Sequence, residues 1–371
     1  MLISAAQTSG PMLKVTWDGG SLTEYPLIWL RDNCASGFHP ETLERQFDLL
    51  SVPHEIAARE VQSDGKSVRI RWDSDPPHES RFDAGWLAAH RPGVRTKDPA
   101  DVSVELWRAN FKPPRFKAQA LLEGDAALLD FAITVKRTGI VLVDGLGSDA
   151  DAGFALGKRM GFLRPTNFGL SFRVESKPNP NALAYTADAL PLHTDLPNHE
   201  LPPGFQFLHC LSNEAEGGGS IFADGFAIAE QIRRESPRAF ELLSSIAVPF
   251  RFHDDTDDIR AHRPMIGLDE RGRVFDIRYS AHLAEPLDME PSVIVEYYRA
   301  YRLLMAATRA PQNQISLRLE AGQVAIFDNR RVLHGRAAYR PNSGHRLLSG
   351  FYVDRAEWDS RIRRLSQSSA G

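Results

Sequence analysis

Extended segments lie on both sides of the helical segments in this 371-residue chain, and strands and helices do not alternate regularly. Such an order is typical of a β-sandwich decorated by helices, in the α+β or mainly β class. The pattern predicts helices over 118–137, 226–246 (interrupted at Pro237) and 291–310, strands over 140–143 and 350–354, and a β-hairpin from 316–319 and 324–327.

Residues 1–95 are predicted to form a small β-rich N-terminal domain. Leu13–Trp17 alternates between apolar and polar residues, a second extended run continues through Trp29 after a Gly-rich turn, and 67–72 alternates again. Prolines and charges over 96–118 are typical of a linker, which leaves 119–371 as the second domain.

Composition excludes several classes of protein. The net charge is −4 and no basic run is present, so neither a nucleic-acid partner nor a membrane partner is expected. Two cysteines, Cys34 and Cys210, are too few for a disulfide scaffold and fit a reducing cytosol. No apolar run reaches the roughly 20 residues that span a bilayer, and the N-terminus does not read as a signal peptide. A cytoplasmic enzyme is the expectation.

The sharpest local signal is His193-Thr-Asp195. Side chains two apart on an extended segment point the same way, so this pair can hold one side of a metal ion. His334, which follows the predicted hairpin, is the best candidate for a third ligand. Two imidazoles and one carboxylate are the ligand set of non-heme Fe(II) oxygenases, which leaves coordination positions open.

Arg346 lies twelve residues after His334. A guanidinium group suits bidentate binding of the far carboxylate of 2-oxoglutarate, whose other end would chelate the iron. A zinc hydrolase can use the same three metal ligands, but the trailing arginine argues against that reading.

Several further segments are shared with a known family: Trp29-Leu-Arg-Asp-Asn-Cys34, 190–197, 207–211, 223–227, His334-Gly and Arg346. Through these segments the chain resembles the γ-butyrobetaine hydroxylase-like branch of the taurine dioxygenase superfamily, over nearly its whole length. The resemblance implies a double-stranded β-helix (jelly-roll) catalytic domain and a homodimer. It also implies a hydroxyl contact from Ser220 to 2-oxoglutarate.

The same resemblance implies an aromatic cage for a trimethylammonium group, which cannot donate hydrogen bonds and is recognised by ring faces. Carried over by position, the cage consists of Phe168, Phe172, Tyr185 and Tyr352.

The opposite end of the substrate pocket departs from the family pattern. Ala182 stands where the family has a carboxylate-binding Asn, with Asn181 one place off, and Ser280 or Ala281 replaces the second Asn. The anion is therefore expected to be bound differently, with Arg278, Tyr279 and His282 as further candidates.

A retained cage and a changed anion site favour a close analogue of γ-butyrobetaine. 2-(Trimethylammonio)ethylphosphonate is an attractive substrate, because a phosphonate carries more charge and has three acceptor oxygens. Arg or His side chains would therefore suit it better than amides. The alternatives are hydroxylation of trimethyllysine or another amino acid and, outside the enzymes, a catalytically silent jelly-roll sensor or scaffold.

Relatives in this branch bind structural zinc in the N-terminal domain through three Cys and one His. Here Cys34 is retained, Ser36 and His39 occupy the next two positions, and His78 matches the His. Cys34, His39 and His78 would make only a degenerate site, and structural zinc normally has four ligands, so zinc is not expected.

Overall fold

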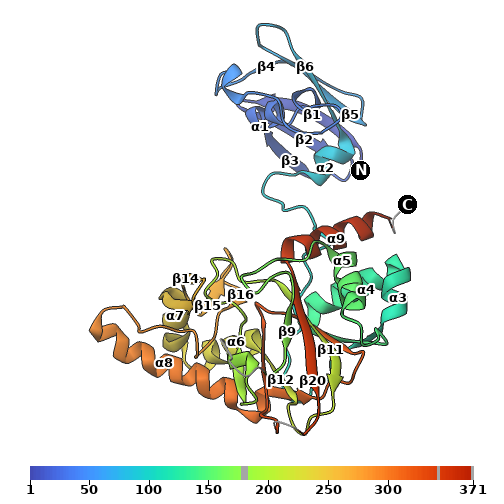
Figure 1. Cartoon of the computed structure of the whole chain (residues 1–371). Coiled ribbons are helices and arrows are strands. Elements are labelled where there is room, and N and C mark those ends of the chain that lie inside the picture. The colour runs from blue at the N-terminus through green and yellow to red at the C-terminus, as the bar shows by residue number, and fades with distance from the viewer. Residues whose placement is uncertain (177–182, 341–342, 369–371) are drawn as a thin grey trace. The chain divides into compact units, whose positions relative to one another are not determined.

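The computed structural model describes residues 1–176, 183–340 and 343–368. The chain divides into two compact units, Met1–Asp98 and Pro99–Gly371, which are described separately (Figure 1). Within the described residues, no helix combines the length and the apolar character needed to cross a membrane.

The first unit contains two three-stranded antiparallel sheets and two short helices around one apolar core. Alternate residues of β2, such as Leu13 and Val15, are fully buried there. The prediction of an extended segment through Trp29 is wrong at its end, where the chain forms a helix from Leu27 onward. Leu27 and Leu30, three residues apart, are both buried on one face of this helix. The elements are β1 (Ile3–Ser9), β2 (Met12–Trp17), β3 (Leu22–Pro26), α1 (Leu27–Asp32), β4 (Ala58–Ser63), β5 (Ser67–Trp72), β6 (Glu79–Asp83) and α2 (Ala84–Ala89).

From Pro99 onward the chain belongs to the second unit, and the segment before β7 packs against the rest of it. The indole Nε1 of Trp107 donates to the carbonyl of Thr138 at 2.7 Å, and its backbone amide donates to the carboxylate of Asp224 at 3.2 Å. β7 (Arg115–Lys117) then joins a sheet beside β8 (Ile140–Asp144).

Two sheets form the jelly roll of the second unit, which confirms the predicted fold class. The six-stranded sheet has the order β7-β8-β18-β11-β20-β9, and the four-stranded sheet has the order β10-β19-β12-β17. Apolar side chains from both sheets, among them Phe222 and Phe327, pack between them. The remaining strands are β9 (Phe172–Val174), β10 (Leu190–His193), β11 (Phe205–Asn213), β12 (Ser220–Asp224), β17 (Gln314–Leu317), β18 (Val324–Asp328), β19 (Val332–Arg336) and β20 (Arg346–Val353).

Helices pack against the outer face of the six-stranded sheet, as Figure 1 shows for α4 and α5 beside β11 and β20. The predicted helix over 118–137 is divided at Gly124 into two helices. The second of them ends where Gly139 adopts a φ of 81°. Phe131, Phe351 and Trp358 are fully buried in this layer. The helices are α3 (Ala118–Glu123), α4 (Asp125–Thr138), α5 (Ala150–Met160) and α9 (Arg355–Ser368).

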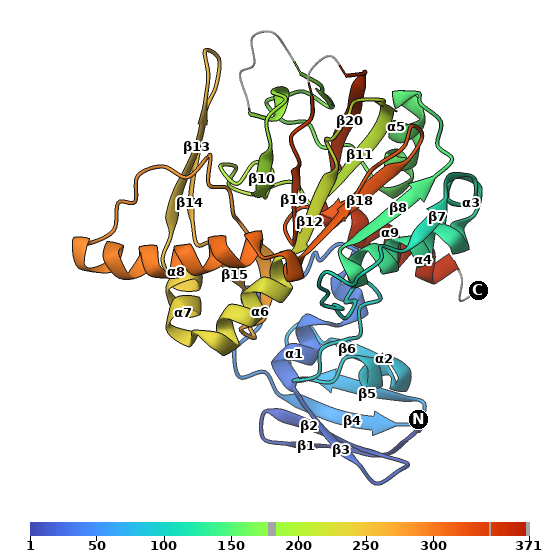
Figure 2. The same ribbon diagram turned by 90° about the horizontal axis from the view of Figure 1, so that it is seen from below.

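A second helical group packs beside the four-stranded sheet. Pro237 begins α7 (Pro237–Ser245) after α6 (Gly225–Glu235), which confirms the predicted interruption, and α8 spans Pro291–Arg309. Along the chain, two small sheets come between α7 and α8. They are β13 (Val248–His253) with β14 (Asp258–Arg263), and β15 (Ile266–Leu268) with β16 (Val274–Ile277). Figure 2 shows the β13–β14 hairpin projecting from the body of the unit.

The hairpin predicted from 316–319 and 324–327 is wrong. Both strands exist, but β17 pairs with β12 in one sheet and β18 pairs with β8 and β11 in the other. The Gly322 turn therefore connects the two layers instead of two neighbouring strands. Ile315 and Phe327 both contribute to the core between the layers, which is the physical reason for the separation.

Candidate active site

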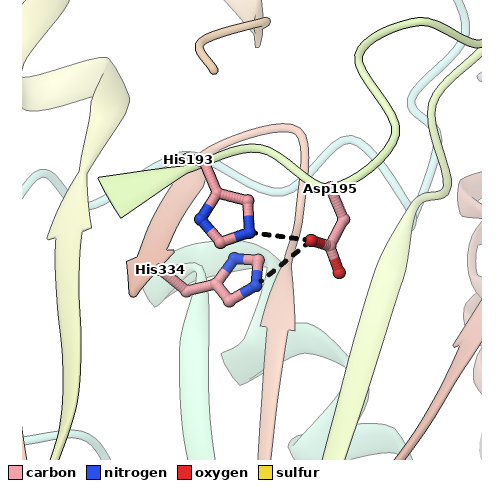
Figure 3. Close-up of side chains that lie close together, drawn as sticks. All are labelled: His193, Asp195 and His334. Atoms are coloured by element: carbon pink, nitrogen blue, oxygen red, sulfur yellow. Dashed lines mark hydrogen bonds and ion pairs between the residues drawn. The ribbon is translucent and has the colours of Figure 1, made fainter. Parts of the chain in front are cut away.

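His193, Asp195 and His334 come together at one edge of the four-stranded sheet, where β10 ends beside β19. His193 ends β10 and faces His334 across the ladder to β19, while Asp195 lies two residues beyond the strand. One ligand atom from each residue lies within 4.8 Å of the others. Figure 3 shows the Nε2 atoms of both imidazoles directed at the Asp195 carboxylate, at 3.0 Å for His193 and 3.4 Å for His334.

Neighbouring groups fix the orientation of these side chains. The Nδ1 atom of His193 lies 2.9 Å from the carbonyl of Pro191, which leaves Nε2 with its lone pair for a metal when Nδ1 carries the proton. The side chain of Asn329 holds the backbone of Asp195 on both sides, accepting from its amide at 2.8 Å and donating to its carbonyl at 3.1 Å. Leu196 follows with a φ of 54°, so the chain turns sharply away after the carboxylate.

The electrostatics of the three residues suit a cation. Burial disfavours the ionised form of Asp195, but the two imidazoles outweigh burial and hold its pKa well below the ordinary value. Burial lowers the pKa of His334, which favours the neutral imidazole that binds a metal. The donor set of two nitrogens and one carboxylate oxygen fits Fe(II) with coordination positions left open.

Arg346 begins β20 on the inner face of the larger sheet and is buried. Its Nε and Nη1 atoms have no hydrogen-bond partner in the described part of the chain. Burial, with the charge of Arg336 as the second cause, lowers its pKa to about 10. A buried guanidinium with unsatisfied donors is costly unless an anion binds it, so this group fits the far carboxylate of 2-oxoglutarate.

Ser220 begins β12 directly after a glycine turn that closes around Arg346. A Cβ atom at Gly218 would lie 3.0 Å from the Nε of Arg346, so the turn can approach the guanidinium only because no side chain intervenes. Ser220 is itself buried, and it lies on the same face of β12 as Phe222, which packs between the two sheets.

Three of the four expected cage residues gather on the Asp195 side of the triad. The rings of Phe172 and Tyr352 lie 5.4 Å apart, and the Tyr352 hydroxyl donates to Oδ2 of Asp195 at 2.7 Å. Tyr185 is buried close enough for Asp195 to raise its pKa, after burial as the larger cause. The ring of Phe172 lies over Gly350, where a Cβ atom would come within 2.3 Å of it.

The fourth residue, Phe168, lines a cavity of about 430 Å³ that opens onto His193 and Asp195. Its ring makes an edge contact with Phe252, with centroids 5.2 Å apart. His282 lines the same cavity, and its ring lies 5.1 Å from that of His193. A larger hollow of about 760 Å³ elsewhere in the second unit is lined by none of the three triad residues.

Two of the expected anion-binding residues are not at this cavity. The Arg278 guanidinium is buried and donates to three backbone carbonyls, those of Pro197, His199 and Glu200. It therefore holds the segment that follows Asp195. Tyr279 packs in the helical core, with its ring 6.2 Å from that of Tyr301. The alternation along 278–282 does not distinguish a pocket-facing residue from a core-facing one. Asn181 lies outside the described residues, as does Ala182.

Several residues of the site were missed from the sequence. Asn329, Arg336 and Phe252 carry no motif of their own. For Asn329, its position between β18 and β19, close before His334, was the available signal. Phe252 comes from a hairpin whose sequence shows only alternation.

In the N-terminal unit, Cys34, Ser36 and His78 are in contact. The Cys34 Sγ atom lies 3.1 Å from the Ser36 hydroxyl and 3.7 Å from Nε2 of His78. The Nδ1 atom of His39 instead accepts hydrogen bonds from the amides of its own loop, at Glu41 and Thr42.

Comparison with known proteins agrees with this geometry. Residues 108–352 match the model of the taurine catabolism dioxygenase TauD, TfdA family, and residues 5–88 match that of the gamma-butyrobetaine hydroxylase-like N-terminal region. The chain is 41% identical to gamma-butyrobetaine dioxygenase of Pseudomonas sp. (strain AK-1), over 98% of this chain and 96% of that protein. It is 30% identical to the mitochondrial trimethyllysine dioxygenase of Gallus gallus, over 98% and 88%.

Among solved structures, the chain resembles a putative alpha-ketoglutarate dependent 2,4-D dioxygenase from Burkholderia xenovorans. The TM-score is 0.52 and the identity is 18%, over 68% of this chain and 99% of the other. At that identity the similarity concerns the fold alone.

Proposed function

The chain belongs to the taurine catabolism dioxygenase TauD, TfdA family, and from that premise we propose that this dioxygenase hydroxylates a small trimethylammonium zwitterion, with γ-butyrobetaine as the first candidate. The observation that carries the proposal is the position of the buried aromatic rings of Tyr352 and Tyr185 beside Asp195. The 41% identity to a gamma-butyrobetaine dioxygenase over nearly the full length favours the same substrate class.

His193, Asp195 and His334 are the proposed Fe(II) ligands, and Arg346 with Ser220 the proposed 2-oxoglutarate site. When bound, the iron would supply activation of dioxygen, coupled to oxidative decarboxylation of 2-oxoglutarate to succinate. The unpaired donors of Arg346 would hold the far carboxylate and so set the direction from which the keto acid reaches the metal.

Phe168, Phe172, Tyr185 and Tyr352 are the proposed cage. Ring faces would hold the quaternary cation by its charge and its methyl surface, and they exclude water at the same time. Because the Tyr352 hydroxyl already donates to Asp195, its ring is fixed relative to a proposed iron ligand. Holding both ends of the substrate would present one carbon between them to the metal.

His282 is the remaining described candidate for the anionic end of the substrate. Its ring lines the cavity beside His193, and the Ser280 hydroxyl lies 3.3 Å from its Nδ1. 2-(Trimethylammonio)ethylphosphonate is a second candidate, because its phosphonate can accept a hydrogen bond from the His282 imidazole. Trimethyllysine is the alternative that the relatives named trimethyllysine dioxygenase support.

Three further features belong to the proposal. A homodimer is inferred from the family resemblance, and light scattering at increasing protein concentration would test it. A cytoplasmic location is inferred from two free and buried cysteines. No structural zinc is included, because the contact between Cys34 and His78 supplies fewer donors than the four of a structural site.

The test is substrate-dependent succinate formation by purified protein with Fe(II) and 2-oxoglutarate, and identification of the hydroxylated product. γ-Butyrobetaine, the phosphonate, trimethyllysine and taurine are compared at equal concentration. We expect turnover with at least one quaternary ammonium compound and none with taurine. Turnover with taurine alone would overturn the substrate class.

A further inference from the structure

Arg336 ends β19, two residues after His334, and its side chain is buried. Its Nη2 atom donates to the carbonyl of Thr186 at 2.7 Å and to the carbonyl of Asp188 at 2.8 Å. The backbone amide of Tyr339 donates to the carbonyl between them, that of Ala187, at 3.2 Å. Three consecutive carbonyls of one loop are therefore held by Arg336, at the end of β19, and by Tyr339, three residues later.

The loop so held connects two parts of the active site. It begins directly after Tyr185, a proposed cage residue, and leads into β10, which ends at His193. Within the loop, the amide and the hydroxyl of Thr186 both donate to the carbonyl of Leu183, and the amide of Asp188 donates to that hydroxyl. The bonds from Arg336 thus hold the segment that directly follows Tyr185.

On its other side, Arg336 lies beside the proposed 2-oxoglutarate subsite. The ring of Tyr339 contacts both guanidinium groups, with its centroid 5.1 Å from the Cζ of Arg336 and 5.6 Å from the Cζ of Arg346. The register of β12 and β19 pairs Arg336 with Ser220. Two like charges thus share one aromatic ring and one buried corner, and the charge of Arg336 acts on Arg346. The carboxylate of Asp188 offsets part of the charge of Arg336, and an anion at Arg346 would relieve the repulsion further.

We propose that Arg336 is a positioning residue that couples the two subsites, so that binding of 2-oxoglutarate at Arg346 orders the 186–188 loop and with it the Tyr185 side of the cage. This inference rests on the proposed function for the identity of the two ligands. A dianion at Arg346 relieves the repulsion between the two guanidinium groups. Arg336 then keeps its Nη2 on the Thr186 and Asp188 carbonyls, and the loop opens less often.

The first measurement uses the wild-type protein alone, so it does not depend on whether a variant folds. Hydrogen exchange of the amides in 183–189 is followed with Fe(II) under argon, with and without 2-oxoglutarate and in the absence of any ammonium substrate. We expect 2-oxoglutarate to slow exchange across this loop. Unchanged exchange with saturating 2-oxoglutarate would overturn the proposal.

The second measurement uses two substitutions at Arg336 and one matched control. Arg336→Met removes the charge and the bonds, whereas Arg336→Lys keeps the charge but lacks the planar group that reaches two carbonyls. Arg340→Gln is the control, because Arg340 is on the same segment but exposed and paired with Glu216. The dissociation constant of γ-butyrobetaine is measured with and without 2-oxoglutarate, together with the KM of each.

In the wild type and in Arg340→Gln we expect 2-oxoglutarate to tighten γ-butyrobetaine binding about fivefold or more, as is typical of coupled sites. Both Arg336 variants should lose that factor and the slowed exchange, with a smaller change in the KM for 2-oxoglutarate than for the ammonium substrate. If Arg336→Lys kept the wild-type coupling, Arg336 would act only through its charge. If the KM for 2-oxoglutarate rose more than the KM for the ammonium substrate, Arg336 would bind 2-oxoglutarate directly. Either result overturns the proposal.

The exchange result separates this inference from the proposed function. If 2-oxoglutarate slows exchange of the loop in the wild type but not in the Arg336 variants, and no quaternary ammonium compound is turned over, the coupling stands and the substrate class falls. If γ-butyrobetaine is turned over but the loop does not respond to 2-oxoglutarate, only the coupling falls.

Discussion

The hydroxyl of Tyr352 donates a 2.7 Å hydrogen bond to Oδ2 of Asp195, so a proposed cage residue and a proposed iron ligand are joined directly. The other oxygen of the same carboxylate faces both imidazoles. The ring that would recognise the substrate cation therefore also orients the carboxylate that would bind the metal. Burial and the nearby Asp195 charge raise the pKa of Tyr352, so the hydroxyl keeps its proton and remains a donor.

Tyr352→Phe separates these two roles. The ring is retained and the hydrogen bond to Asp195 is lost, so we expect Fe(II) affinity to fall about tenfold, the lower end for loss of a group that orients a metal ligand. The KM for the ammonium substrate should change little at saturating Fe(II). Fe(II) titration and steady-state kinetics check this, with Tyr352→Leu as the partner variant that also removes the ring. A raised substrate KM in the Phe variant, with unchanged Fe(II) affinity, would contradict the account.

Gly350→Ala tests the position of Phe172 without touching a proposed ligand. The added methyl group would come within 2.3 Å of the Phe172 ring, so the ring must move off the strand. We expect the KM for the quaternary ammonium substrate to rise about tenfold, the loss expected when roughly 1.4 kcal/mol of cation recognition is removed.

Unchanged Fe(II) and 2-oxoglutarate binding would show that the rest of the site of the Gly350→Ala variant is intact. A wild-type substrate KM in this variant would place Phe172 outside the cage.

Arg346→Met should raise the KM for 2-oxoglutarate by about a hundredfold or more, because it removes a buried bidentate contact to a carboxylate. Arg318→Met is a suitable control, since Arg318 is an exposed neighbour that donates to the carbonyls of Asn213, Ala215 and Gly217. Isothermal titration of 2-oxoglutarate into Mn(II)-loaded protein measures the loss directly. Equal losses in the two variants would indicate a general effect of charge.

His209 predicts a pH dependence of stability that does not involve the metal. Burial lowers its pKa in the folded state, although Nε2 lies 2.8 Å from the carbonyl of Gly147. The unfolded chain therefore binds the proton first, so this residue lowers the free energy of unfolding as the pH falls below about 6.5. The loss continues until the folded-state pKa is reached and is absent above neutral pH.

His209→Gln keeps a side-chain donor for Gly147 and cannot titrate in this range. Denaturant unfolding at several pH values should show a smaller loss of stability in the variant than in the wild type between pH 7 and pH 5. Parallel stability curves for the two proteins would show that His209 is not the titrating group.

Much of this arrangement could be predicted from local sequence, and the parts that could not have a common cause. The separation of His193 and Asp195 by two residues is a property of one extended segment, and the structure brings both to His334. The hairpin prediction for 316–327 was wrong because periodicity identifies strands but not their partners, and here the two strands lie in different sheets.

Long-range contacts also decide which polar residues face the pocket. Arg278 and His282 are four residues apart, yet Arg278 holds the backbone of 197–200 and His282 lines the cavity. Arg336 reads from the sequence as one more arginine near His334, and only the tertiary contacts connect it to the 186–188 loop.

The central claim is tested most directly by succinate formation with Fe(II), 2-oxoglutarate and γ-butyrobetaine, measured in the wild type and in Asp195→Asn. We predict stoichiometric succinate and hydroxylated product from the wild type, loss of both when Fe(II) is chelated, and neither from the variant. If γ-butyrobetaine is not turned over, the phosphonate and trimethyllysine are tested in its place before the substrate class is judged. Iron-loaded wild-type protein whose succinate formation is stimulated by none of the three would contradict the account.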